Sequence, residues 1–222
     1  MSLEARRGAK LADPGAELLD RVGGFWSRFG GIATGAAGVV AVVAAIAFFS
    51  LRARAAQEEQ AASKLAEANL VFWQGDYARS LQMAKQVSEQ FPSTPSGIDA
   101  HRLAGDDSFW SGDFKNAIAE YRKFLEHLQR GMLADAVRRS LAYAYESDGQ
   151  FAQALPLYDG LVGAFDRESS AEFLMAGARC QRNLEKPAEA AKRLQRLLDE
   201  FGETSQAMSA REELAAVQSA AR

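Results

Sequence analysis

Apolar residues recur every three or four positions along most of the chain, which is the spacing of an amphipathic α-helix. One such run is clear over four turns, from Phe114 to Leu128, and similar runs begin at Phe151 and at Ala188. We find no stretch in which apolar and polar residues alternate, as they do in a half-buried strand. The pattern therefore predicts an all-α protein.

A different pattern occupies Gly31–Ser50, where 20 successive residues carry no charge. At a rise of 1.5 Å per residue, a helix of this length spans a hydrocarbon core of roughly 30 Å. A buried helix of a soluble protein would normally keep a polar face over such a length. We therefore expect a transmembrane helix at residues 31–50, a preceding segment at 1–30 and a folded domain at 51–222.

The segment before the span predicts a short interfacial amphipathic helix that Asp13 would cap. Its aromatic and basic residues, Trp26 and Arg28, suit the level of the lipid headgroups. Arg52 and Arg54 follow the span directly and suit its other edge. The alternative interpretation is a disordered tail with a few anchoring aromatic residues.

Two interpretations of the apolar run stay open. It is either a permanent single-span anchor or a signal peptide that is cut after Ala55, since Ala53-Arg54-Ala55 has the small-x-small form of a cleavage site. The long preceding segment and the length of the run favour the anchor. The basic residues before the span favour a cytoplasmic N-terminus, with the large domain on the outer side of a bacterial inner membrane, in the periplasm.

A short sequence motif, called a phrase below, recurs along the rest of the chain. Gly75-Asp76-Tyr77 aligns with Gly112-Asp113-Phe114 and with Gly149-Gln150-Phe151, in steps of 37 residues. A further step of 37 reaches Lys186-Pro187-Ala188. In the first three phrases a glycine ends one helix in the left-handed conformation, the next residue caps the following helix, and an aromatic residue packs between the two. At the fourth phrase Pro187 would serve as a first-turn residue. Each phrase thus predicts a corner between paired helices.

These corners and the apolar spacing predict four helix pairs and a terminal helix that closes the stack. Ser96 with Asp99, and Ser169 with Glu172, have the spacing of a capping box and predict helix starts. We expect helices after the span near residues 56–73, 77–91, 97–111, 114–129, 133–147, 151–165, 170–184, 187–201 and 205–220.

Composition narrows the class of function. The net charge is -3, which argues against nucleic acid as a partner. The single cysteine, Cys180, excludes an intrachain disulfide. The two histidines, His101 and His127, have no nearby Cys/His cluster and are expected to be solvated or to line a groove. The sequence shows no metal-ligand spacing and no phosphate-binding loop, so we expect no metal, no cofactor and no enzymatic activity.

Helix pairs with glycine–aromatic corners resemble the tetratricopeptide repeat. Its usual period is 34 residues, and the three extra residues here would lie in the connections between repeats. The order of a short cytoplasmic segment, one span and a compact repeat domain also resembles the YfgM-like ancillary subunit of the bacterial Sec translocon, which implies a periplasmic domain beside the translocon and its chaperones. The residues that carry the repeat resemblance are Gly75, Tyr77, Pro92, Gly105, Gly112, Phe114, Ala117, Tyr121, Ala142, Gly149, Phe151, Ala154 and Tyr158.

The fold implied by this resemblance presents a concave surface lined by the first helix of each pair. Aligning the corners places six residues on that surface, and the alternative is that they are ordinary surface residues. Leu65 and Ser140 stand where polar groups would clamp a terminal carboxylate, so capture of a peptide C-terminus is not predicted. The six residues are Asn69, Arg102, Asp106, Arg139, Tyr143 and Cys180.

Three functions fit this organisation. The first is a membrane-anchored scaffold that holds protein partners near the membrane. The second is a structural subunit of a larger membrane complex. The third is an exported periplasmic repeat protein of envelope assembly or division, released by cleavage near Ala55.

Overall fold

The computed structural model describes residues 14–220 of the chain. All regular secondary structure in this range is helical, which confirms the predicted all-α fold. Asp13, which we expected to cap the first helix, lies outside the described residues. The helices are α1 (Pro14–Trp73), α2 (Tyr77–Gln90), α3 (Pro95–Trp110), α4 (Phe114–His127), α5 (Met132–Ser147), α6 (Phe151–Leu161), α7 (Arg167–Asn183), α8 (Pro187–Phe201) and α9 (Ala207–Ala220).

The chain divides into two compact units, Met1–Ala55 and Ala56–Arg222. In the first unit, the described residues belong to α1, which is long and apolar enough to cross a membrane. The large apolar side chains of this unit are exposed, among them Val39, Ile46 and Phe49. The sequence predicted separate helices over 31–50 and 56–73, whereas α1 is one uninterrupted helix. No proline follows Pro14 within it, so nothing forces a break.

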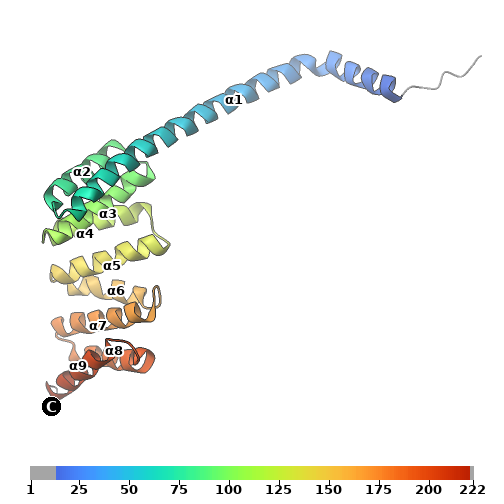
Figure 1. The fold of residues 1–222 in the computed structure, drawn as a ribbon. Helices are drawn as coiled ribbons and strands as arrows, with labels where there is room; N and C mark the ends of the chain where they lie inside the picture. The colour runs from blue at the N-terminus through green and yellow to red at the C-terminus, as the bar shows by residue number, and fades with distance from the viewer. Residues whose placement is uncertain (1–13, 221–222) are drawn as a thin grey trace, which may run out of the picture. The chain divides into compact units, whose positions relative to one another are not determined.

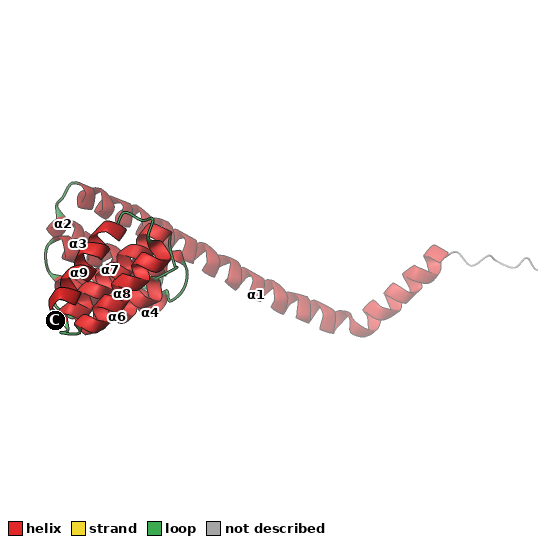
Figure 2. Cartoon of the chain, turned by 90° about the horizontal axis from the view of Figure 1, so that it is seen from below, coloured by secondary structure: helices red, strands yellow, loops and turns green. Residues whose placement is uncertain are grey.

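The second unit is a stack of helix pairs. Residues 56–73 of α1 pair with α2, and the pairs α3–α4, α5–α6 and α7–α8 follow in chain order, with α9 against α8 (Figure 1). Figure 2 shows the same stack from below, with its helices packed side by side. Each junction buries its own apolar cluster, such as Val87 with Leu103 and Phe124 with Val137. The stack is therefore held together by contacts between neighbouring helices, as in a solenoid.

The first three corners share one backbone geometry. Gly75, Gly112 and Gly149 have φ values of 84°, 79° and 74°, a conformation that costs a residue without a Cβ very little. At the first two corners an aspartate follows and caps the next helix. Asp76 accepts from the amide of Arg79 at 3.2 Å, and Asp113 accepts from the amide of Asn116 at 3.1 Å.

The fourth corner corrects the predicted alignment by one residue. Glu185 takes the left-handed position with φ 59°, Lys186 stands at the cap, and Pro187 begins α8. Pro187 therefore occupies the place of the aromatic residue that begins α2, α4 and α6, instead of the place of the capping aspartate. The step from Gly149 to Glu185 is 36 residues. The sequence did not predict this corner, because a glutamate gives no indication of a left-handed backbone conformation.

Two predicted helix starts are also wrong. The cap of α3 is Thr94, whose hydroxyl accepts from the amide of Gly97 at 3.0 Å, and not Ser96. The cap of α7 is Asp166, which accepts from the amide of Ser169 at 2.8 Å. In both cases a residue upstream of the proposed capping box took the role, because it could reach the amide three positions ahead.

One junction of the stack carries a buried carboxyl group. Asp107 of α3 is fully buried, and its Oδ2 lies 2.9 Å from the hydroxyl of Ser80 on α2, which in turn lies 3.0 Å from the carbonyl of Ala68 on α1. The pKa of Asp107 is raised to about 7, mainly by burial; the hydrogen bond from Ser80 opposes the rise and the charge of Asp106 adds to it. The single hydrogen of the Ser80 hydroxyl serves either the carboxylate of Asp107 or the carbonyl of Ala68; when it goes to Ala68, a protonated Asp107 can donate to Ser80.

Candidate partner-binding groove

Two adjoining hollows lie on the side of the stack formed by the first helices of the repeats. One, with a volume of about 590 Å³, lies between the end of α1 and α3, and the other, of about 210 Å³, lies between α3 and α5. Asp106 and Trp110 line both hollows, so the two hollows form one continuous groove. Five of the six residues predicted for the concave surface line this groove: Asn69, Arg102, Asp106, Arg139 and Tyr143.

In the first two repeats, an aromatic pair at the end of the first helix is divided between the core and the groove. Phe72 and Phe109 pack on the apolar clusters, whereas the side chains of Trp73 and Trp110 are 80% and 63% exposed. Neighbouring residues on a helix point about 100° apart, so a Phe-Trp pair serves both surfaces. Tyr77 stacks on Trp110 with ring centroids 6.3 Å apart, which extends an aromatic wall across the first hollow.

The polar groups of the first hollow bind one another. Arg102 donates to Asp99 at 2.6 Å and to Asp106 at 2.7 Å, and the hydroxyl of Tyr121 donates to the other oxygen of Asp106 at 2.7 Å. Burial raises the pKa of Asp106, although Arg102 and Tyr121 oppose the rise. The Nδ2 group of Asn69 donates to the carbonyl of Leu65 on its own helix at 2.9 Å, so its amide oxygen stays available for a ligand.

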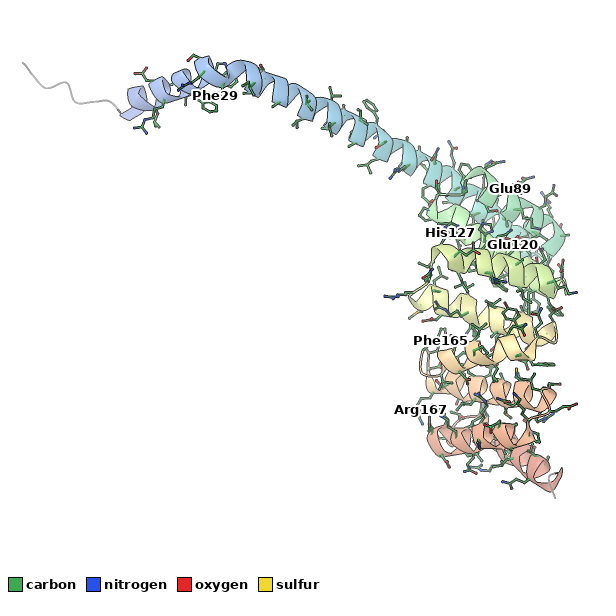
Figure 3. The ribbon with its side chains drawn as sticks, turned by 180° about the vertical axis from the view of Figure 1, so that it is seen from behind. Phe29, Glu89, Glu120, His127, Phe165 and Arg167 are labelled. Carbon is green, nitrogen blue, oxygen red and sulfur yellow. The ribbon has the colours of Figure 1, made fainter. Side chains whose placement is uncertain are left out.

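Arg139 lines the second hollow and contacts an aromatic ring that lies outside the lining of that hollow. The guanidinium of Arg139 lies over the ring of Phe165, 5.4 Å from its centroid, and has no carboxylate partner among the described residues. Phe165 is labelled in Figure 3 and belongs to the connection between α6 and α7. The hydroxyl of Tyr143 donates to Glu172 of α7 at 2.8 Å. Burial, and next the bond to Glu172, raise the pKa of Tyr143.

Cys180, the sixth predicted surface residue, is misplaced. Its side chain is completely buried between α6 and α7, where burial raises the pKa of the thiol to about 12. The one-residue shift at Glu185 explains the error, because counting back from the true corner places Arg179 at the equivalent position. The guanidinium of Arg179 donates to Glu146 of α5 at 3.0 Å and 3.3 Å. Arg179 and Glu146 are thus surface residues that the sequence alignment missed.

His101 was expected to be solvated or to line a groove, and it does neither. Its Nδ1 lies 2.7 Å from a carboxylate oxygen of Glu120, which also accepts from Lys123 at 2.9 Å. Glu120 is labelled on α4 in Figure 3, so this contact joins the two helices of one repeat. Burial would raise the pKa of Glu120, but the bonds from His101 and Lys123 outweigh it and lower the pKa. The contact is structural.

The tetratricopeptide repeat-like domain family matches residues 24–165 of this chain, and a tetratricopeptide repeat matches residues 173–204. The first match covers more than half of the sequence, and the chain belongs to this family. Domains of this class bind protein or peptide partners and are generally non-catalytic scaffolds. No curated protein matches the chain.

Solved structures of other repeat proteins share the fold. A tetratricopeptide repeat protein from Parabacteroides merdae has a TM-score of 0.62 at 16% identity, over 72% of this chain and 61% of that one. YrrB, described as having an unusual peptide-binding site, has a TM-score of 0.57 at 17% identity, over 70% of this chain and 75% of its own. MamA from Desulfovibrio magneticus has a TM-score of 0.55 at 14% identity, over 72% and 93%. At these identities the likeness concerns the fold.

Proposed function

We propose that this protein is a membrane-anchored scaffold whose repeat domain binds protein partners in the groove. The observation that carries the proposal is the groove itself, a continuous aromatic and charged surface on the first helices of the repeats. A surface that combines exposed tryptophans with arginines has the composition of binding hot spots. Asn69, Arg102, Asp106, Arg139 and Tyr143 are the residues that we assign to partner binding.

The anchor is argued from the apolar part of α1. Its large side chains are exposed, so lipid is the environment that would cover them. The family match begins at residue 24, before the apolar run, which supports the run as a shared part of the domain rather than a removable leader. Trp26, Arg28, Arg52 and Arg54 flank the run at both edges and suit the two headgroup layers.

Orientation and place complete the proposal. We assign residues 1–30 to the cytoplasm, residues 31–50 to a bacterial inner membrane and the repeat domain to the periplasm, beside the Sec translocon and its chaperones. Tethering raises the effective concentration of the domain for partners at the same membrane, so even a weak groove would be occupied there.

Two measurements test the anchor and its orientation. The N-terminal sequence of the mature protein should begin before the span, and a start at Ala56 would instead identify an exported protein. Protease added to spheroplasts should digest the repeat domain, whereas protection of residues 56–222 would reverse the orientation.

Photo-crosslinking tests the groove. A photoreactive residue at Trp73 or Trp110 should capture a protein partner in native membranes, and the same residue at exposed Met208 on α9 serves as the control. Translocon or chaperone components at the groove would support the proposed place. A different partner in fixed stoichiometry would identify a structural subunit of another complex, and equal capture at Met208 would remove the groove assignment.

A further inference from the structure

Arg139 differs from Arg102 and Arg179 in the group that lies against its positive charge. Arg102 pairs with Asp99 and Asp106, and Arg179 pairs with Glu146. Arg139 is half-buried and, within residues 14–220, has no carboxylate paired with it, while the ring face of Phe165 lies against its guanidinium. An aromatic ring attracts a guanidinium more weakly than a carboxylate does, so Arg139 keeps its capacity for a bidentate carboxylate bond.

The carboxylate and the tyrosine hydroxyls of the second hollow are already hydrogen-bonded. Asp106 accepts from Arg102 and Tyr121, and the hydroxyl of Tyr143 donates to Glu172. An incoming carboxylate would therefore meet the charge of Arg139 without having to break an existing ion pair. An incoming ammonium group would meet a like charge at the same place, which disfavours a basic ligand.

The wall beside Arg139 is apolar. Trp110 lines the same hollow and offers a largely exposed indole, and Tyr77 stacks on that indole from the first hollow. Covering exposed aromatic surface with an apolar side chain is favourable, because it removes both surfaces from water. Acidic and apolar features of a ligand would thus be read at neighbouring positions of one groove.

This inference rests on the proposed function and specifies its ligand. We propose that the groove binds an extended internal peptide segment that carries an acidic side chain on Arg139 and a large apolar side chain on Trp110. Side chains two apart in an extended peptide point the same way, so one intervening residue is the shortest spacing at which both can face the groove. The segment is internal, since no clamp for a terminal carboxylate accompanies Arg139.

The test uses the full chain held in lipid nanodiscs and a displayed library of random heptapeptides with fixed flanks at both ends. Selection on the unchanged protein should enrich an acidic residue two positions from a large apolar residue. Selection on Arg139→Gln should lose the acidic preference and keep the apolar one, and selection on Trp110→Ala should lose the apolar one. Arg139→Lys keeps the charge and should keep a weakened acidic preference.

The affinity of one selected peptide is then measured by fluorescence anisotropy, which gives the contribution of its acidic residue to binding. Replacing its acidic residue by the matching amide should weaken binding about tenfold to the unchanged protein and less than twofold to Arg139→Gln. Enriched peptides without an acidic preference, or with the same preference on Arg139→Gln, would overturn this inference and leave the proposed function intact. Failure to enrich any peptide above empty nanodiscs would count against both.

Discussion

Glu58 of α1 holds the start of α3. One of its carboxylate oxygens accepts from the hydroxyl of Ser96 at 2.7 Å, and the other accepts from the amide of Ser96 at 3.1 Å. Glu168 of α7 makes a similar contact with Ser205, in which Oε2 accepts from the hydroxyl at 2.9 Å and from the amide at 3.1 Å. The two glutamates stand at equivalent positions of the first and last repeats, so each ties the start of one repeat to the start of the next segment.

Removing this contact should weaken the first junction. Charge-assisted hydrogen bonds of this kind contribute about 1–2 kcal/mol, and we expect Glu58→Ala to lower the free energy of unfolding by that amount. The amide of Ser96 should then exchange its hydrogen roughly tenfold faster. Glu59→Ala changes an exposed neighbour on the same helix and is the matched control. Equal urea midpoints for the two variants would show that the contact contributes nothing.

Gly105 is required by the ring of Tyr121. A Cβ at this position would lie 2.5 Å from Cε1 of that fully buried ring, whose hydroxyl is fixed by Asp106. We expect Gly105→Ala to destabilise the fold by about 1–3 kcal/mol, as overpacking usually does. Gly160 lies in α6 with nothing within 4 Å, so Gly160→Ala should be neutral or stabilise by up to about 1 kcal/mol. Thermal unfolding compares the two, and similar melting temperatures would contradict the argument.

Glu185 holds a conformation that suits glycine. At the other three corners a glycine occupies the left-handed position, whereas Glu185 adopts φ 59° with a side chain. We expect Glu185→Gly to raise the free energy of unfolding by about 0.5–1 kcal/mol, because relief of the strain exceeds the added entropy of the unfolded chain. Lys186→Gly, one position later, should destabilise. A loss of stability in Glu185→Gly, measured by urea unfolding, would be the contrary result.

The buried carboxyl of Asp107 should make stability depend on pH. Its pKa in the folded chain, about 7, lies above the ordinary value of 3.8. Between these values the folded chain keeps a proton that the unfolded chain has lost, so stability falls as pH rises and levels off above pH 7. We expect a contribution of about 1 kcal/mol per pH unit between pH 5 and 6.5.

The variant Asp107→Asn isolates this contribution. An asparagine fills the same space and can donate to Ser80, but it does not titrate. The difference in unfolding free energy between the variant and the unchanged chain should grow from pH 5 to pH 7 in favour of the variant. Because the other titrating groups are common to both proteins, their contributions cancel. A difference that stays constant over this range would refute the assignment.

The sequence predicted the architecture well where local chemistry determined it. Gly75 and Gly112 are glycines because their corners need a positive φ, and the aspartates that follow them are caps, so both roles were visible in the letters. The predicted position of the fourth corner was wrong by one residue. Glu185 adopts its positive φ under the constraint of packed neighbours, and residue propensities do not predict this. This single shift moved the expected surface position from Arg179 to the buried Cys180.

The sequence predicted which side chains lie on the groove, but it did not fully predict which residues they pair with. Counting from the corners placed Arg102 and Arg139 on the same surface, because helical spacing fixes which face a residue occupies. The two ion pairs of Arg102 follow from helical spacing, because Asp99 and Asp106 lie three and four residues away on the same helix. Arg139 also has a carboxylate four residues away, Asp135, but that carboxylate pairs with Arg138, and the sequence does not decide between the two.

The pairing of Asp107 with Ser80 also favours the correct order of helices in the stack. Chains built from similar helix pairs are prone to join the wrong partners. The residues equivalent to Ser80 in the later repeats are Ala117, Ala154 and Ala190, none of which offers a hydroxyl. Against any of them the carboxyl of Asp107 would be buried without a partner, which is costly. Pairing α3 with one of those helices in place of α2 would carry this cost, which disfavours misassembly at the first junction.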